Sequence, residues 1–296
     1  AHGRYPAGRR PDLERPGRHQ VVRVRARDGL RLSGRWLEAE PGDPSWALDP
    51  HEAIVLLHGW SGSVAPHLVE YGPFLRRTAG VLGLDSRGHG ESDDSPTTFG
   101  LREVEDVAGA LSWLGERGVE RVALVGMSMG GITAIASVAV LGDGSLAGTD
   151  VDVAAPAFVP SPRRPRIVAI VADSVSPDLP SVVVPSIPGP ARRIVAARLF
   201  DAVAQTLGDD PRATEPIRVI GLLEGVPLLL ISGEADPIVT PEAARRLAAA
   251  APPGTELRTV PGAGHRGAHA VDPGEYETRA TRHLRDAFLG AREAAL

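Results

Sequence analysis

One pentapeptide of this 296-residue sequence has the residue types and spacing of a reactive serine turn. Residues 126–130 are GMSMG, with Ser128 at the centre, and they join an apolar run of short and β-branched residues to a run that suits a helix. A serine in a sharp turn between a strand and a helix exposes its hydroxyl at the helix N-terminus, where free N–H groups favour developing negative charge. The small outer glycines let the strand and the helix approach each other. The pattern predicts that Ser128 is a nucleophile, and a tight Gly/Ser turn without a chemical role is the alternative.

A serine hydroxyl becomes a useful nucleophile when a base removes its proton and a carboxylate orients that base. Two later residues fit these roles, because Asp236 and His265 each stand just past the end of a predicted strand. The order serine, aspartate, histidine along the chain is one of the known orders of such triads. Asp173, which ends another apolar run, and Glu234 are the alternative carboxylates.

Other histidines and glycines near these residues resemble parts of a zinc site and of a dinucleotide site, but their sequence context disfavours both sites. His265 and His269 have the spacing of two zinc ligands on a helix, but Gly264 and Gly267 disfavour a helix there and no third ligand stands nearby in the sequence. Residues 262–267 match the glycine pattern of dinucleotide-binding folds, but no further strand follows to complete such a unit. We therefore expect no metal ion and no cofactor.

Two loops earlier in the chain carry polar residues with expected structural roles. We expect Asp85 to brace its own loop with Arg87. His58 is expected to hold loop backbone by hydrogen bonds, which is the common role of a partly buried histidine. None of these three residues is predicted to act in catalysis.

The elements that must position these residues follow from the pattern of apolar residues. Residues 21–27 and 30–36 alternate apolar with polar residues around an Asp-Gly turn, which predicts an antiparallel hairpin. The later apolar runs are nearly continuous and alternate with helix-compatible sequence, which is typical of parallel strands buried on both faces. We expect strands at 53–57, 79–85, 121–126, 166–173, 226–232 and 255–260, and helices at 104–117, 241–251 and 275–289. The predicted fold class is α/β, with a mostly parallel twisted sheet, helices on both faces and an antiparallel N-terminal hairpin.

The predicted domain organisation is one α/β domain, residues 21–296, behind an N-terminal arm. Residues 1–20 contain five arginines, two acidic residues and three prolines without apolar periodicity, which predicts a flexible, solvated arm. Residues 143–165 are predicted to form a surface excursion, and residues from about 177 to 225 a small cap over the strand ends. Because the chain begins at Ala1, contact with a membrane is expected only through a segment that precedes it. A cytoplasmic location is favoured, with N-terminal anchoring or export as the alternative.

Composition narrows the classes of function. A net charge of −5 provides no overall positive field, so we expect no nucleic-acid partner. The sequence contains no lysine and no cysteine, which excludes Schiff-base chemistry, thiolate nucleophiles and disulfides. Residues 122–142 are uncharged over a length that could span a membrane, but the glycines in their middle favour a strand, a turn and a helix.

Five motifs in register resemble the α/β-hydrolase family, over residues 21–289. They are LHGW at 57–60, DSRGHGES at 85–92, GMSMGG at 126–131, GEAD at 233–236 and GAGH at 262–265. The resemblance implies an α/β-hydrolase fold in which Ser128 attacks, His265 acts as base and then as acid, and Asp236 orients the histidine. It also implies an oxyanion hole formed by the backbone N–H groups of Trp60 and Met129, and acyl transfer needs two such convergent donors.

The finer resemblance is to bacterial serine esterases of the BEM46-like and prolyl-oligopeptidase-related branch, on residues 100–114 and 171–177. The predicted activity is hydrolysis of a small-molecule carboxylic ester through an acyl-serine intermediate, without metal or cofactor. A peptidase or amidase with the same triad is one alternative, and a non-catalytic α/β hydrolase that binds a ligand or partner is the other. The sequence makes no prediction of the oligomeric state.

Overall fold

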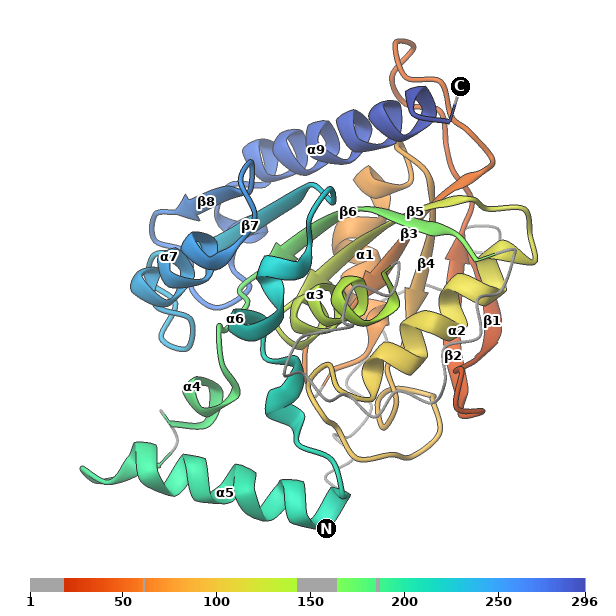
Figure 1. Cartoon of the computed structure of the whole chain (residues 1–296). Helices are drawn as coiled ribbons and strands as arrows, with labels where there is room; N and C mark the ends of the chain where they lie inside the picture. The colour runs from red at the N-terminus through yellow and green to blue at the C-terminus, as the bar shows by residue number, and fades with distance from the viewer. Residues whose placement is uncertain (1–18, 61, 143–163, 185–186, 296) are drawn as a thin grey trace.

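The fold is built on one mixed sheet of eight strands (Figure 1). The computed structural model describes residues 19–60, 62–142, 164–184 and 187–295. The strands are β1 Gln20–Arg25, β2 Arg31–Leu37, β3 Glu52–Leu57, β4 Gly80–Leu84, β5 Arg121–Met127, β6 Arg166–Asp173, β7 Leu228–Gly233 and β8 Glu256–Val260. Their order in the sheet is β1-β2-β4-β3-β5-β6-β7-β8, with β1–β2 and β2–β4 antiparallel and all other pairs parallel. The predicted hairpin and parallel sheet are therefore confirmed.

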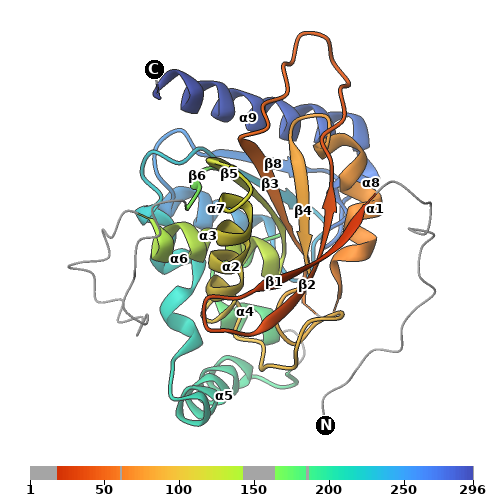
Figure 2. The same cartoon turned by 90° about the vertical axis from the view of Figure 1, so that its right-hand side faces the viewer.

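The central strands are buried on both sides, which explains why their apolar runs are continuous. Along β3, Val55 and Leu57 belong to one core cluster, whereas Ile54 and Leu56 belong to the other. Helices cover both faces of the sheet, α2 and α3 on the first and α1 and α9 on the second (Figure 2). Their bounds are α1 Val64–Leu75, α2 Glu103–Gly115, α3 Met129–Leu141 and α9 Pro273–Glu293. Two more helices, α7 Pro241–Ala250 and the short α8 Ala268–Val271, follow β7 and β8.

The sequence pattern did not predict α1. Its N-cap residue, Ser63, makes no side-chain capping bond, and no acidic residue stands in its first turn, so the usual start signals are missing. Pro73 lies inside the helix, where a proline normally indicates its end. Packing on the sheet therefore stabilises this helix, since Leu68 and Tyr71 are buried in the second core cluster.

The uncharged stretch at 122–142 forms β5, a sharp turn and α3, as predicted. The predicted helix at 275–289 begins two residues earlier as α9, because Asp272 caps it by accepting the Glu275 N–H. Within the described ranges, no helix has the length and apolar character that crossing a membrane requires.

Between β6 and β7 the chain leaves the layered core. This part contains α4 Leu179–Val183, α5 Arg192–Leu207, α6 Pro216–Val219 and the 3-10 turns η2 Pro211–Thr214 and η3 Ile220–Leu222. Figure 1 shows α4 and α5 set apart from the sheet and its covering helices. Arg102 joins the end of α5 to the body, because it donates to Leu207 O at 3.0 Å and to Asp209 Oδ2 at 2.9 Å.

Two parts of the predicted domain organisation fall largely outside the described residues. These are positions 1–18 of the arm and positions 143–163 of the excursion. The predicted division into arm, domain, excursion and cap therefore stays a prediction.

Candidate active site

Ser128 stands in a sharp turn between β5 and α3. Its backbone has φ 53° and ψ −114°, outside the regions that residues with a side chain ordinarily adopt. A Cβ on Gly126 would lie 2.3 Å from Gly130 O, and one on Gly130 would lie 2.3 Å from Leu57 O, so both positions require glycine. The Ser128 N–H donates to Asp173 O at 2.8 Å, which ties the turn to the end of β6. The glycine spacing thus places a strained serine at the start of a helix.

Of the side chains predicted as a triad, His265 lies within hydrogen-bonding distance of both others. His265 Nε2 is 3.0 Å from Ser128 Oγ, and His265 Nδ1 is 2.8 Å from Asp236 Oδ2. Because an ionised carboxylate only accepts hydrogen bonds, Nδ1 carries the proton of the neutral ring and Nε2 can accept the serine proton. The Asp236 side chain is fully buried, and that of His265 is 17% exposed. This arrangement can take a proton from the serine hydroxyl and stabilise the imidazolium that results.

The second oxygen of Asp236 is held by backbone. Oδ1 accepts the N–H groups of Ile238 at 2.8 Å and of Val239 at 2.9 Å. These bonds fix the rotation of the carboxylate, so that Oδ2 faces the histidine. They also compensate the loss of water around a buried charge.

His58 orients the peptide that joins Gly59 to Trp60. Its Nδ1 lies 2.7 Å from Gly59 O, and its Nε2 lies 3.0 Å from the Ser86 N. Burial lowers the pKa of His58 to about 4, so the ring is neutral at neutral pH, with Nδ1–H donating to Gly59 O and Nε2 accepting the Ser86 N–H. In a planar trans peptide the C=O and the N–H point in opposite directions. Anchoring the Gly59 carbonyl therefore turns the Trp60 N–H away from His58.

The loop that carries Trp60 lies against the nucleophile turn. A Cβ on Gly130 would also lie 2.8 Å from His58 O, so loop and turn are in direct backbone contact. Met129 begins α3, and its N–H is one of those that a helix leaves without an intrahelical partner. The loop that leads to Trp60 and the start of α3 are thus neighbours, and the oxyanion hole of Trp60 and Met129 stays a prediction.

A sequence profile described as the alpha/beta hydrolase family matches residues 54–279, which include Ser128, Asp236 and His265. The chain belongs to the α/β-hydrolase family. Among solved structures, the esterase Pf2001 of Pyrococcus furiosus superposes on this hydrolase with a TM-score of 0.63 at 21% identity, covering 91% of this chain and 92% of that one. The α/β hydrolase GrgF from Penicillium sp. sh18 superposes with a TM-score of 0.63 at 18% identity, covering 91% and 98% of the two chains. At such identities the likeness shows the fold alone.

The hydrolase also has relatives by sequence. It is 26% identical to YfhR of Escherichia coli O157:H7 over 255 residues, which are 84% of this chain and 74% of YfhR. It is 30% identical to YfhR of Salmonella typhimurium over 128 residues, and this match spans only 41% of the relative's length. The predicted fold class and family are confirmed, and the finer BEM46-like placement stays a prediction.

The alternative carboxylates have other partners. Asp173 is fully buried at the end of β6, and its Oδ1 accepts the Ser174 hydroxyl at 2.8 Å. Burial raises the pKa of Asp173 to about 6. Glu234 is exposed and accepts the Thr259 hydroxyl at 3.1 Å. Among the described carboxylates, Asp236 is the one that hydrogen-bonds His265.

The two histidines with zinc-like spacing do not converge. His269 Nδ1 lies 3.0 Å from Glu70 Oε1, and its Nε2 lies 3.1 Å from Glu277 Oε1, whereas His265 faces Asp236. In the part of the chain that the structure describes, no group of three or more potential ligand side chains is placed to hold a metal ion.

The expected pairing of Asp85 with Arg87 is wrong. Arg87 is buried and forms ion pairs with Asp106 at 2.7 Å and with Asp28 at 2.8 Å. Asp85 instead accepts the Val64 N–H at 2.7 Å, at the start of α1. The pattern around Asp85 could not reveal this, because both partners of Arg87 come from distant segments.

Backbone strain gathers around the triad. Within the described residues, the positive-φ positions other than glycine are Phe99, Ser128, Ser174 and Arg266. Arg266 directly follows His265, and its N–H donates to Ser174 Oγ at 2.9 Å. Strain of this kind persists only where the surrounding structure holds it, and it is common at functional sites. Sequence reasoning missed Ser174 and Arg266, because neither residue type indicates a left-handed conformation.

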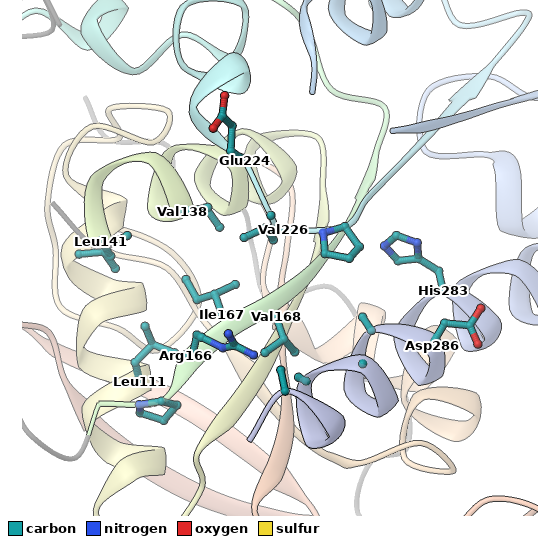
Figure 3. A pocket seen from close by; sticks show the side chains of 18 of the residues that line it. Leu111, Val138, Leu141, Arg166, Ile167, Val168, Glu224, Val226, His283 and Asp286 are labelled. Carbon is teal, nitrogen blue, oxygen red and sulfur yellow. The ribbon is translucent and has the colours of Figure 1, made fainter. Parts of the chain in front are cut away.

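A cavity of about 860 Å³ lies at the amino ends of β6 and β8, and no triad residue lines it. Figure 3 shows the side chains around it. Its apolar lining includes Val138 and Leu141 of α3 and Ile167 of β6. Gly142 and Arg164 also line the cavity, and they border residues 143–163, which the structure does not describe. We therefore assign no ligand to this cavity.

Proposed function

We propose that this hydrolase cleaves small-molecule carboxylic esters, with Ser128 as nucleophile, His265 as general base and acid, and Asp236 as the orienting carboxylate. The observation that carries the proposal is the continuous hydrogen-bond chain from Ser128 Oγ through His265 to Asp236, at 3.0 and 2.8 Å. A nucleophile within reach of a base that a third group orients is the signature of nucleophilic catalysis. Family membership supports hydrolysis, and the fold likeness to proteins named as esterases, Pf2001 and RhEst1 from Rhodococcus, is consistent with ester substrates.

In the first half of the reaction, Ser128 Oγ attacks the ester carbonyl carbon while its proton moves to His265 Nε2. A C–O bond forms and the carbonyl π pair moves to the oxygen, which accepts hydrogen bonds from the N–H groups of Trp60 and Met129. The Asp236 carboxylate stabilises the imidazolium. When the tetrahedral intermediate collapses, the bond to the alcohol oxygen breaks, His265 Nε2–H protonates that oxygen, and an acyl-serine remains.

In the second half, water repeats the attack in place of serine. His265 Nε2 removes a proton from water as its oxygen bonds to the acyl carbon, and the same two N–H groups hold the second oxyanion. Collapse breaks the bond to Ser128 Oγ, which takes back the proton from His265. The products are a carboxylic acid and an alcohol, and the enzyme returns to its starting state.

Residues from about 177 to 225 form a cap in this proposal. The insertion closes on itself at its base, because the Ile217 N–H donates to Pro177 O at 2.9 Å and the Leu179 N–H donates to Glu215 Oε1 at 3.0 Å. Such closure supports one folded unit between β6 and β7.

Replacing His58 with alanine is expected to lower kcat about 10- to 100-fold with little change in KM, because the Gly59 carbonyl loses its anchor and the Trp60 N–H its fixed direction. Losing an oxyanion donor outright costs about 10²- to 10³-fold. Steady-state kinetics on a p-nitrophenyl ester measure the effect. His58→Asn should retain more activity, since its amide can replace the Nδ1–H donor.

A matched control for the His58 experiment is His51→Ala, because exposed His51 bonds the Gly118 carbonyl at 2.8 Å, far from the triad along β3. Unchanged kcat in folded His58→Ala would refute the role of this histidine in the oxyanion hole.

The proposed function is tested by comparing leaving groups on wild-type protein. We expect the protein to hydrolyse p-nitrophenyl butyrate. Its kcat/KM for an aminoacyl p-nitroanilide should be far below its kcat/KM for this ester. Preference for the anilide would instead support the peptidase alternative, which uses the same triad. Turnover of neither compound, together with no labelling by a fluorophosphonate, would support a non-catalytic binding protein.

A further inference from the structure

Ser174 links the end of β6 to the loop that carries the histidine. Its side chain is buried, and its Oγ donates to Asp173 Oδ1 at 2.8 Å while accepting the Arg266 N–H at 2.9 Å. Its own N–H donates to Ile231 O of β7 at 2.8 Å, so both ends of the residue are fixed. The hydroxyl therefore forms a rigid bridge from the sheet to the residue that follows His265.

The bridge ends on a strained residue. Arg266 has φ 58° and Ser174 has φ 57°, and both lie in the left-handed region that residues with a side chain avoid. The hydrogen bond from the Arg266 N–H to Ser174 Oγ is one contact that can stabilise this conformation, although residues with a side chain prefer a negative φ. If the bond were absent, the turn that presents His265 could relax and carry the imidazole with it.

Asp173, the neighbour of Ser174 in the chain, also holds the nucleophile. Asp173 O accepts the Ser128 N–H at 2.8 Å, and Ser174 Oγ accepts the Arg266 N–H. The end of β6 is thus a common support for the serine and for the histidine loop. A shift of about 1 Å between reacting groups can cost about 100-fold in rate, so such a support matters for catalysis.

The carboxyl of Asp173 stands behind the bridge and is fully buried. Tyr276 of α9 and Tyr71 of α1 face it from the helical layer, and His265 and Asp236 act on it from the two loops of the triad. Its raised pKa, about 6, means that it is largely ionised at pH 8 and favours a positive charge on the nearby imidazole.

We infer that Ser174, supported by Asp173, positions His265 for proton transfer to and from Ser128. This inference rests on the proposed function. Ser174 is a positioning residue, because its hydroxyl reaches Arg266 and Asp173 and not the reacting atoms. Asp173 fixes the direction of the Ser174 hydroxyl and adds a negative charge to the field around His265.

The first test replaces Ser174 with alanine. We expect kcat for a p-nitrophenyl ester to fall about tenfold, the equivalent of about 1.4 kcal/mol, with KM unchanged, because proton transfer is impaired and substrate contacts are not. Ser174→Thr, which keeps the hydroxyl, should recover part of the loss. The matched control is Ser137→Ala in α3, since Ser137 is also buried and its hydroxyl has no hydrogen-bond partner among the described residues.

The second test replaces Asp173 with asparagine, which can still accept the Ser174 hydroxyl but carries no charge. We expect the acid limb of the pH profile of kcat/KM to shift to lower pH, because an imidazolium without the nearby anion loses its proton more readily. A carboxyl with a folded pKa near 6 and an unfolded pKa of about 3.9 destabilises the fold once pH rises through that window. Asp173→Asn should therefore raise Tm at pH 8 and leave it nearly unchanged at pH 4.

The results separate this inference from the proposed function. A purely structural role for Asp173 would change Tm and leave the acid limb in place, which would overturn the part assigned to it. Wild-type kcat in Ser174→Ala, with wild type active, would overturn the inference itself. If wild type shows no turnover, the proposed function has failed instead. Should Ser174→Ala not fold, kcat of Ser174→Gly decides, because glycine removes the same hydroxyl and favours the positive φ of this position. A kcat reduced about tenfold supports the inference, and a wild-type kcat overturns it.

Discussion

Replacing Ser128 with alanine is expected to lower kcat for a p-nitrophenyl ester about 10⁵- to 10⁶-fold, which leaves only the residual rate that substrate binding and the oxyanion hole supply. Alanine has no oxygen to attack the carbonyl, so His265 and Asp236 remain in place without a nucleophile to activate. Ser128 makes no side-chain capping bond to α3, so the fold loses no cap with the hydroxyl. Calorimetry should find a Tm close to that of wild type, beside the kinetic loss.

Ser137→Ala again provides the control for the Ser128 variant, because it removes a buried serine hydroxyl from α3, the helix that directly follows Ser128. It should keep wild-type kcat. Turnover by Ser128→Ala within tenfold of wild type would show that another residue attacks the substrate.

Replacing Asp236 with asparagine is expected to lower kcat about 10³- to 10⁴-fold. The asparagine oxygen can keep the bonds from the N–H groups of Ile238 and Val239, so the loop should hold its shape. The NH₂ group then faces His265 Nδ1 and donates to it. This forces the proton of the neutral ring onto Nε2, which can no longer accept the proton of Ser128.

Glu234→Gln is the matched control for Asp236→Asn, since it neutralises an exposed carboxyl two residues earlier in the same loop. We expect it to keep wild-type kinetics. If Asp236→Asn stays within tenfold of wild type while Asp173→Asn loses several orders of magnitude, the orienting carboxylate is Asp173.

The sheet could be predicted from the sequence because burial on both faces leaves a continuous apolar run. The runs at β3, β5 and β6 show this, since nearly every residue in them is buried. Helix α1 could not be predicted in this way. Pro73 and the uncapped start at Ser63 argue against a helix locally, and only packing of residues such as Tyr71 on the sheet outweighs them.

The serine turn could be predicted because Gly126 and Gly130 stand where the backbone of neighbouring segments leaves no room for a side chain. The choice between Asp173 and Asp236 was harder, because Asp173 stands at the end of one apolar run and Asp236 shortly after the end of the next. The structure separates them by geometry: Asp173 is still within β6 and is fully buried, whereas Asp236 lies three residues beyond β7 and can reach His265. The support from Ser174 depends on left-handed backbone at residues whose types do not indicate it.

The most direct test of the account is to label the protein with a fluorophosphonate, digest it and locate the adduct by mass spectrometry. The probe reacts with a serine that a neighbouring base has activated, so its position reports the nucleophile without any assumption about the natural substrate. We predict one adduct, on Ser128, which is absent from Ser128→Ala and strongly slowed in Asp236→Asn. An adduct on a different serine, or equal labelling of Ser128→Ala and wild type, would contradict the account.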